Sequence, residues 1–172
     1  HTHTKKVKQG DPESRNIDVV KFTDIINKTD VKILGITNHN HFDHEQYIQF
    51  KNSVDGTCQI WPGVEFDILE EERRAHLIAI VNPKNAKAFG DKVNEVIGST
   101  SADTFTINID DVVSKFNEFD TIFIAHYLSK KPSLTDKDVE KLIGLVSNPK
   151  RVLKEASNSI SAGIYINHGH NS

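Results

Sequence analysis

The sequence predicts an α/β fold organised as one domain over residues 1–172. Short runs rich in branched apolar residues, which are typical of buried strands, alternate with segments whose apolar residues recur at helical spacing. This repeated strand-then-helix order predicts a parallel sheet with helices packed outside it. The 172 residues are 37% hydrophobic, which is far from a disordered composition, and no internal repeat or low-complexity linker divides them.

The predicted elements follow one another along the whole chain. In order, they are a helix over 17–26, a strand over 31–37, a helix over 43–54, a strand–turn–strand unit over 59–69, a strand over 75–81, helices over 84–97 and 110–119, a strand over 121–125, helices over 134–146 and 150–156, and a strand over 162–167.

Capping and turn residues support several of these boundaries. Asn16 and Asn108 have the side chains of N-caps for the helices that follow them, and Thr135 has Asp138 three residues later, as in a capping box. The Pro62-Gly63 pair predicts a turn between two strands, because proline and glycine are the strongest turn residues.

The length limits how these strands can close. A closed barrel of eight strand–helix units takes roughly 250 residues and rarely fewer than about 200. The sequence shows only five or six strands, so the sheet is either open or part of a barrel cut at both ends. The chain contains no methionine and opens on His1, which favours a truncated barrel.

Composition excludes several classes of function. A formal net charge of -3 excludes a strongly basic nucleic-acid coat protein. The single cysteine, Cys58, cannot form an internal disulfide and is typical of a reducing compartment. The longest apolar runs are too short to span a membrane, and the chain opens with no secretory signal. We therefore expect a cytoplasmic protein with no membrane partner.

The histidines stand where a metal site would need them. His1 and His3 form an H-x-H pair, whose side chains project to the same face of a strand. His39 and His126 each follow a predicted buried strand, at the edge where α/β folds carry their functional residues. Imidazole and carboxylate ligands delivered to this edge by several strands are what a divalent-metal hydrolase requires.

Five motifs occur in a fixed order over positions 1 to 126. They are His1-Thr2-His3-Thr4, Thr37-Asn38-His39, Pro62-Gly63-Val64-Glu65, His76-Leu77-Ile78 and Ala125-His126. This series resembles the PHP family, named for its polymerase and histidinol phosphatase members, with its H-x-H-[ST], T-D-H, P-G-x-E, strand histidine and A-H motifs. The segments at 36–43 and 123–126 look most like the PHP domain that precedes an AAA-type ATPase in TrlF-like bacterial proteins.

The resemblance implies a distorted (β/α)7 barrel of about seven strands, here truncated at both ends, with two or three divalent ions (zinc, manganese or iron) at one mouth. Carried over motif by motif, the metal ligands are His1, His3, His39, Glu65, His76 and His126. Glu65 and His126 would also act in catalysis, Glu65 because one residue must offer two oxygens to two ions.

The implied activity is hydrolysis of a phosphodiester or phosphomonoester by a hydroxide shared between metal ions. The partners implied are a phosphate-ester substrate, a nucleic acid in a nuclease-like or DNA-repair role, and an ATPase domain C-terminal to this one.

Three departures from the family pattern keep alternatives open. Asn38 replaces the aspartate of T-D-H, and Asp11 is displaced from the place of a further ligand. The closing D-x-H motif is missing, although His168 and His170 have its spacing. A non-catalytic, degenerate PHP module with a structural or regulatory role therefore stays an alternative. A metal hydrolase of the amidohydrolase type also opens with H-x-H, but its carboxylated lysine and late aspartate cannot be placed.

Overall fold

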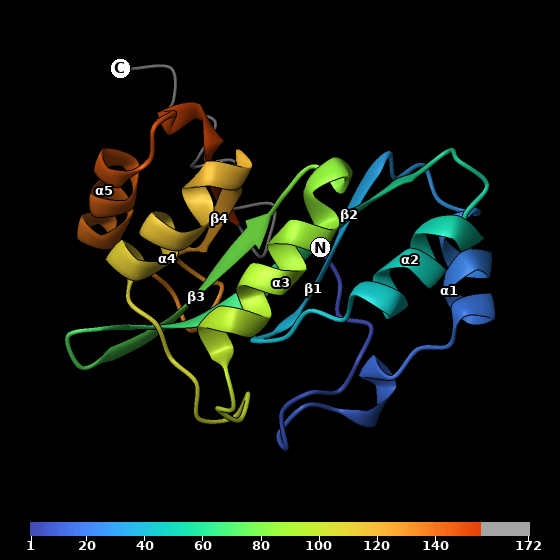
Figure 1. Ribbon diagram of the computed structural model, residues 1–172, viewed down its shortest axis with the longest axis horizontal. Coiled ribbons are helices and arrows are strands. Elements are labelled where there is room, and N and C mark those ends of the chain that lie inside the picture. Colours follow the sequence, from blue (N-terminus) through green and yellow to red (C-terminus); the bar gives the residue numbers. More distant parts are fainter. Residues whose placement is uncertain (156–172) are drawn as a thin grey trace.

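A computed structural model describes residues 1–155, which form one five-stranded sheet with helices packed against it (Figure 1). The strands lie in the sheet in the order in which they occur in the sequence. They are β1 (Ile33–His39), β2 (Gln59–Glu70), β3 (Arg73–Ile80), β4 (Ile122–His126) and β5 (Val152–Glu155).

The predicted helices of the first 146 residues are all present, with boundaries shifted by a few residues. They are α1 (Val19–Ile26), α2 (His44–Ser53), α3 (Ala86–Ile97), α4 (Ile109–Phe116) and α5 (Asp136–Leu145). Short 3-10 turns lie at Glu13–Arg15, Pro83–Asn85, Asn117–Phe119 and Pro149–Arg151. The predicted Asn108 cap and the Thr135–Asp138 capping box are confirmed, whereas Asp18 rather than Asn16 caps α1.

The sheet is mixed and open, so the predicted parallel sheet and truncated (β/α)7 barrel are wrong. β1 and β2 run parallel, β3 runs antiparallel to both of its neighbours, and β4 and β5 run parallel. The physical reason is the connection between β2 and β3, a tight turn after Glu70 that leaves no room for a crossover helix. Within residues 1–155, β1 and β5 do not pair with each other.

The predicted turn at Pro62-Gly63 is also wrong, because both residues lie inside the continuous strand β2. Pro62 has no N–H to donate, but its carbonyl accepts a hydrogen bond from Val81 N–H at 3.0 Å. Gly63 is needed for close packing: a Cβ there would stand 2.7 Å from the Ala79 carbonyl oxygen and 2.9 Å from Thr37 Cγ2. The glycine therefore allows β1, β2 and β3 to approach closely beside the predicted ligands.

The helices bury the apolar face of the sheet. Phe66 of β2 packs its ring against Phe116 of α4, with ring centroids 5.1 Å apart, and Phe22 of α1 packs against Phe50 of α2 at 4.5 Å. Along the sheet, α1 and α2 lie together at one end, α4 and α5 at the other, and α3 between them (Figure 1). Since side chains alternate along a strand, the residues next to Phe66, Glu65 and Asp67, face the opposite side.

The last described segment differs from its prediction. A helix was expected over 150–156, but a single 3-10 turn at Pro149–Arg151 leads directly into β5. The expected strand over 162–167 lies outside the described residues, so the prediction of one domain over 1–172 stays a prediction. Among residues 1–155, no helix has the length and apolar character that a membrane crossing requires.

Candidate metal centre

The sheet register brings the strand-borne ligands to one place. His39 closes β1 and pairs with Glu65 in the middle of β2, while His76 lies on the neighbouring β3 and His126 closes β4. The apolar pattern buries these strands, and the clustered polar side chains project from the face of the sheet opposite Phe66. Four strands therefore each contribute one side chain to a single cluster.

The H-x-H segment runs beside β1 and adds two more histidines. Thr2 N–H donates to the Gly35 carbonyl at 2.8 Å, and Thr37 N–H donates to the Thr2 carbonyl at 2.9 Å, in a parallel bridge. His1 and His3 flank Thr2, so both side chains project to the same face, as their spacing predicts.

Glu65 is the centre of the cluster, and each of its carboxylate oxygens faces different histidines. Oε1 lies 2.6 Å from His76 Nδ1 and 3.1 Å from His39 Nε2, and we call these two histidines the Oε1 side. His126 Nε2 stands further from the same oxygen, at 3.8 Å.

The other oxygen of Glu65 faces the N-terminal histidines. Oε2 lies 3.3 Å from His3 Nε2 and 3.5 Å from His1 Nε2, and we call this pair the Oε2 side. Oε2 is buried and has no hydrogen-bond partner within residues 1–155. A carboxylate oxygen held in that state needs a cation.

The electrostatics of Glu65 fit this need. Burial alone would raise its pKa, but the neighbouring rings of His3, His39 and His76 hold the pKa of this carboxyl far below its usual range. Glu65 is only 2% exposed, so its negative charge is almost fully removed from water. Burial also lowers the pKa of His126 to about 4, which keeps its ring neutral and able to bind a metal.

Two further carboxylates form an outer layer on the Oε1 side. Asp67 Oδ1 lies 3.1 Å from His76 Nε2, and Asp11 Oδ1 lies 3.4 Å from His39 Nδ1. Each histidine thus has one nitrogen toward Glu65 and the other toward an outer carboxylate, as ligating histidines usually do. Although burial would lower it, the Asp67 and Glu65 carboxylates raise the pKa of His76 above its ordinary value.

Each outer carboxylate is paired with a cation. Lys8 Nζ lies 2.5 Å from Asp67 Oδ2, and Arg15 Nη1 lies 2.5 Å from Asp11 Oδ1. Burial would raise the pKa of both carboxyls, yet His76 and Lys8 lower it for Asp67, and the backbone N–H groups of Lys8 and Val7 lower it for Asp11. Both outer carboxylates are therefore charged.

Asn38, the departure from T-D-H, serves the cluster indirectly. Its Oδ1 accepts hydrogen bonds from Thr4 N–H at 2.8 Å and Lys5 N–H at 3.1 Å. These contacts tie the H-x-H segment to β1. An amide oxygen can make them as well as a carboxylate.

All six ligands expected from the sequence meet in this cluster, and Asp11 joins them as an outer residue. The residues that sequence reasoning missed are Lys8, Arg15, Asp67 and Glu155. Asp67 carried a usable signal, since it stands two residues after Glu65 in a strand and so shares its face. His168 and His170 lie outside the described residues.

Three groups within residues 1–155 have ligand atoms within 4.8 Å of one another: His39, Glu65 and His76; His1, His3 and Glu65; and His1, His126 and Glu155. Their mixed nitrogen and oxygen donors suit zinc, manganese or iron. Buried atoms without a hydrogen-bond partner, among them Glu65 Oε2 and His126 Nε2, occur in the second and third groups. The donor set therefore fits divalent metal.

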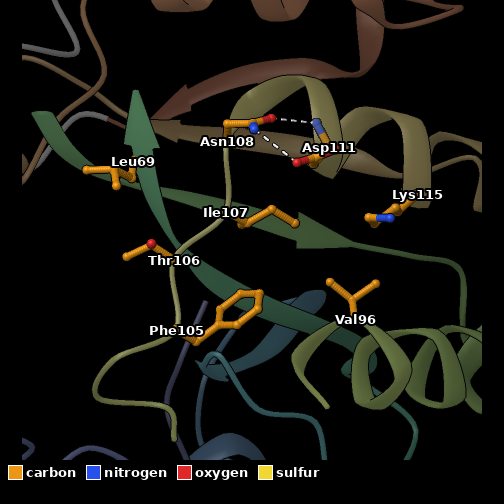
Figure 2. Close-up of a pocket in the computed structure, with 8 residues that line it drawn as sticks. All are labelled: Leu69, Val96, Phe105, Thr106, Ile107, Asn108, Asp111 and Lys115. Carbon is orange, nitrogen blue, oxygen red and sulfur yellow. Dashed lines mark hydrogen bonds between the residues drawn. The ribbon is translucent and has the colours of Figure 1, made fainter. Parts of the chain in front are cut away.

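A separate cavity of about 330 Å³ lies between β2, α3 and α4 (Figure 2). It contains none of the clustered histidines, and its polar groups serve the fold. Asn108 Oδ1 accepts from Asp111 N–H at 2.8 Å, and Asn108 Nδ2 donates to Asp111 Oδ2 at 2.9 Å, which caps α4. The candidate metal ligands therefore lie in the histidine cluster and not in this cavity.

No protein-family model and no curated protein sequence matches the chain. Among solved structures, a protein from Bifidobacterium adolescentis named a "putative metal-dependent phosphoesterase" is similar to it with a TM-score of 0.49 and 8% sequence identity. The alignment covers 74% of this chain and 68% of that one. The residues of the centre are accordingly assigned from their own geometry.

Proposed function

We propose that this protein is a metal-dependent phosphoesterase whose centre is built around Glu65. The observation that carries the proposal is the placement of the two Glu65 oxygens between two separate pairs of histidines. A single carboxylate in that position, with a histidine pair at each oxygen, would help to hold two neighbouring cations, and two-metal sites are typical of phosphate-ester hydrolases.

The four inner histidines and Glu65 form the metal-binding part of the proposed centre. His39 and His76 on the Oε1 side, and His1 and His3 on the Oε2 side, would hold the ions, with Glu65 shared between the pairs. When bound, divalent ions supply a nucleophile at neutral pH by acidifying water, and they stabilise the charge that develops on phosphoryl oxygens.

The outer residues orient the histidine rings and reduce the negative charge of the cluster. Asp11 and Asp67 face the nitrogens of His39 and His76 that point away from Glu65, so the inner nitrogens of both rings would bind the metal. Lys8 and Arg15 offset these carboxylates, so an anionic phosphate approaches a cluster whose negative charge is already reduced. His126, neutral near pH 7 because of its burial, stands beside Glu65 as a further ligand or proton acceptor.

The substrate belongs to the proposal only as a class, a phosphodiester or phosphomonoester. A nucleic-acid substrate, a coupled ATPase domain and a cytoplasmic location stay predictions from the family resemblance. The non-catalytic alternative loses its main support, since Asn38 contacts the H-x-H segment rather than a ligand position.

The test is metal content followed by activity. We expect protein purified without chelators to contain about two or more equivalents of zinc, manganese or iron by elemental mass spectrometry. The same protein should hydrolyse p-nitrophenyl phosphate or bis(p-nitrophenyl) phosphate, and His76→Ala should reduce both metal content and hydrolysis.

His44→Ala is the matched control, because His44 lies at the start of α2 and outside the cluster. It should keep wild-type metal content and activity. Absence of metal in the wild type, with none taken up from added zinc, manganese or iron, would refute the proposal and leave a scaffold role.

A further inference from the structure

Glu155 is an acidic residue beside the cluster that belongs to none of the recognised motifs and faces His1 and His126 rather than the Oε1 side. β4 and β5 run parallel and pair His126 with Glu155, so the two side chains leave the sheet at the same end. His126 is 2% exposed. β5 therefore delivers a carboxylate directly beside a buried imidazole.

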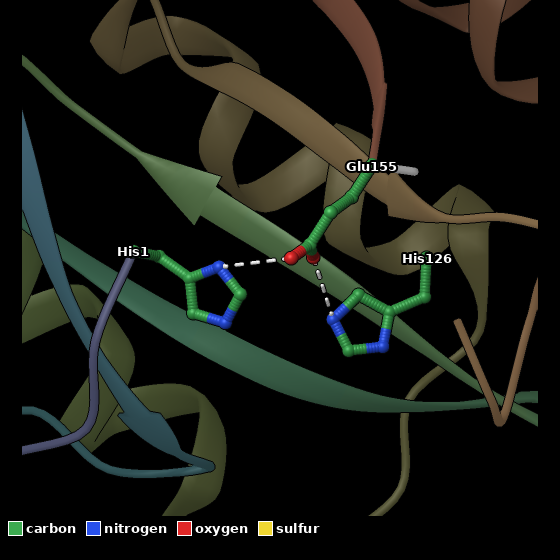
Figure 3. Close-up of side chains that lie close together, drawn as sticks. All are labelled: His1, His126 and Glu155. Atoms are coloured by element: carbon green, nitrogen blue, oxygen red, sulfur yellow. Dashed lines mark ion pairs between the residues drawn. The ribbon is translucent and has the colours of Figure 1, made fainter. Parts of the chain in front are cut away.

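The close-up in Figure 3 shows the Glu155 carboxylate between the rings of His1 and His126. Glu155 Oε2 lies 3.2 Å from His126 Nε2, and Oε1 lies 3.6 Å from His1 Nδ1. Despite this proximity, neither Glu155 Oε2 nor either ring nitrogen of His126 has an aligned hydrogen bond within the described residues. Buried polar atoms that converge without an aligned hydrogen bond are stabilised by a cation placed between them.

We infer that Glu155 is a metal ligand, which with His126 and His1 holds a divalent cation beside the one or two ions at Glu65. The inference rests on the proposed function and extends it to a residue outside the motifs. Carboxylate oxygen and imidazole nitrogen together suit zinc, manganese or iron. We call these three residues the Glu155 group.

His1 limits how the positions are filled. Its Nε2 faces Glu65 Oε2 and its Nδ1 faces Glu155 Oε1. A neutral imidazole has a single lone-pair nitrogen, so His1 serves one of the two positions at a time. Glu155 and His126 are then the constant part of the group.

Lys130 forms an ion pair with Glu155, so its removal should affect metal binding in the opposite direction to the removal of Glu155. Its Nζ lies 3.2 Å from Glu155 Oε1, so it competes with any metal for the same carboxylate. If Glu155 binds metal, removing the Lys130 charge strengthens metal binding while removing the Glu155 charge weakens it. If Glu155 serves only the ion pair with Lys130, neither substitution changes metal content.

The experiment compares Glu155→Gln, Lys130→Gln and Glu118→Gln with the wild type. Glu118 is exposed and remote from the cluster, so it is the matched control. Each protein is stripped of metal and titrated with Mn²⁺, with bound ion counted by electron paramagnetic resonance and by elemental mass spectrometry. Circular dichroism and melting temperature verify folding, which the isosteric Gln preserves.

We expect Glu155→Gln to bind about one equivalent less Mn²⁺ than the wild type and Lys130→Gln to bind its weakest ion about tenfold more tightly. Unchanged stoichiometry and affinity in both variants, with metal still bound, would overturn the role of Glu155 and leave the Glu65 centre intact. A wild type that binds no Mn²⁺, zinc or iron would overturn the proposed function itself. Should Glu155→Gln fold poorly, the sign of the Lys130→Gln effect decides the question.

Discussion

The Oε1 side together with Glu65 has the same residue types as the Glu155 group, one glutamate and two histidines, but only the Oε1 side has an outer layer of carboxylates. There, His39 and His76 each face a second carboxylate, and Arg15 and Lys8 neutralise those carboxylates. In the Glu155 group, His126 has no aligned hydrogen bond at either nitrogen within residues 1–155.

This difference separates two ways of building a metal site. On the Oε1 side, the outer carboxylates orient the rings before any cation arrives, so we expect tight binding. In the Glu155 group, orientation depends on strand register and on the cation itself. We therefore expect the Oε1 side to fill first and the Glu155 group last.

The largest effect should follow from Glu65→Gln, which removes the charge shared by both sides. The amide is isosteric, so the sheet should fold, but the histidines lose the anion that draws cations to them. We expect metal content to fall by about two equivalents and phosphoester hydrolysis by at least about 10³-fold. Elemental mass spectrometry and a p-nitrophenyl ester assay measure both.

Glu72→Gln serves as the control for that substitution, since Glu72 is exposed in the turn between β2 and β3. It should behave as wild type. Retention of full metal content by Glu65→Gln would show that the central carboxylate is not a ligand.

The outer layer is tested by Asp67→Asn. The amide oxygen can still accept from His76 Nε2, but it lacks the charge that raises the basicity of the ring. We expect metal affinity on the Oε1 side to fall by about 10- to 100-fold, with the remaining ions unaffected. Competition with a chelator of known affinity measures the change, and Asp91→Asn on the exposed face of α3 is the control. An equal loss of metal affinity at every position would contradict the division of the centre into an Oε1 side and separate further positions.

The Oε2 side depends on how the H-x-H segment is anchored. Asn38→Ala leaves the N–H groups of Thr4 and Lys5 without their acceptor, which should cost about 1–3 kcal/mol of unfolding free energy. Because these contacts anchor the segment carrying His1 and His3, the variant should also lose metal. Asn38→Asp keeps the acceptor and should restore both properties. Urea unfolding and metal content test this, and loss in both variants would argue against anchoring.

Part of this centre was predictable from sequence because the motif residues lie in or at the end of apolar strand segments, with His39 and His126 closing theirs. The α/β class, the strand positions and the meeting of His39, Glu65 and His76 all follow from that pattern. The direction of a strand does not, since an apolar run reads the same in parallel and antiparallel sheets. The predicted barrel failed for that reason, at the turn between β2 and β3.

Glu155 was missed for a related reason. Val152–Glu155 is too short for its apolar spacing to distinguish a strand from a helix. Its neighbours in space, His1 and His126, are distant in the sequence and meet it only through the order of strands in the sheet. Lys8 and Arg15 likewise lie in an irregular segment whose path no periodicity predicts.

The smallest expected effect is the pH dependence of the stability of the metal-free protein, which compares the Oε1 side directly with the Glu155 group. The pKa of His126 is lowered by burial to about 4, below the ordinary 6.5, whereas that of His76 is raised by its carboxylates. Between pH 6.5 and 4, the unfolded state therefore holds more protons at His126 than the folded state does, and stability falls as the pH falls. At His76 the sign is reversed, since the folded state keeps its proton to higher pH and that stability is lost as the pH rises above 6.5.

His126→Asn should accordingly lose less stability than the wild type on going from pH 6.5 to 4, and His76→Asn should lose more. Melting temperatures of the metal-free proteins at the two pH values measure this, and the ring resonances of His126 should titrate near pH 4 by NMR. Equal midpoints for the two rings would mean that the Glu155 group and the Oε1 side share one electrostatic environment. The proposed difference between the Oε1 side, whose rings are oriented by outer carboxylates, and the Glu155 group, whose rings are not, would then be wrong.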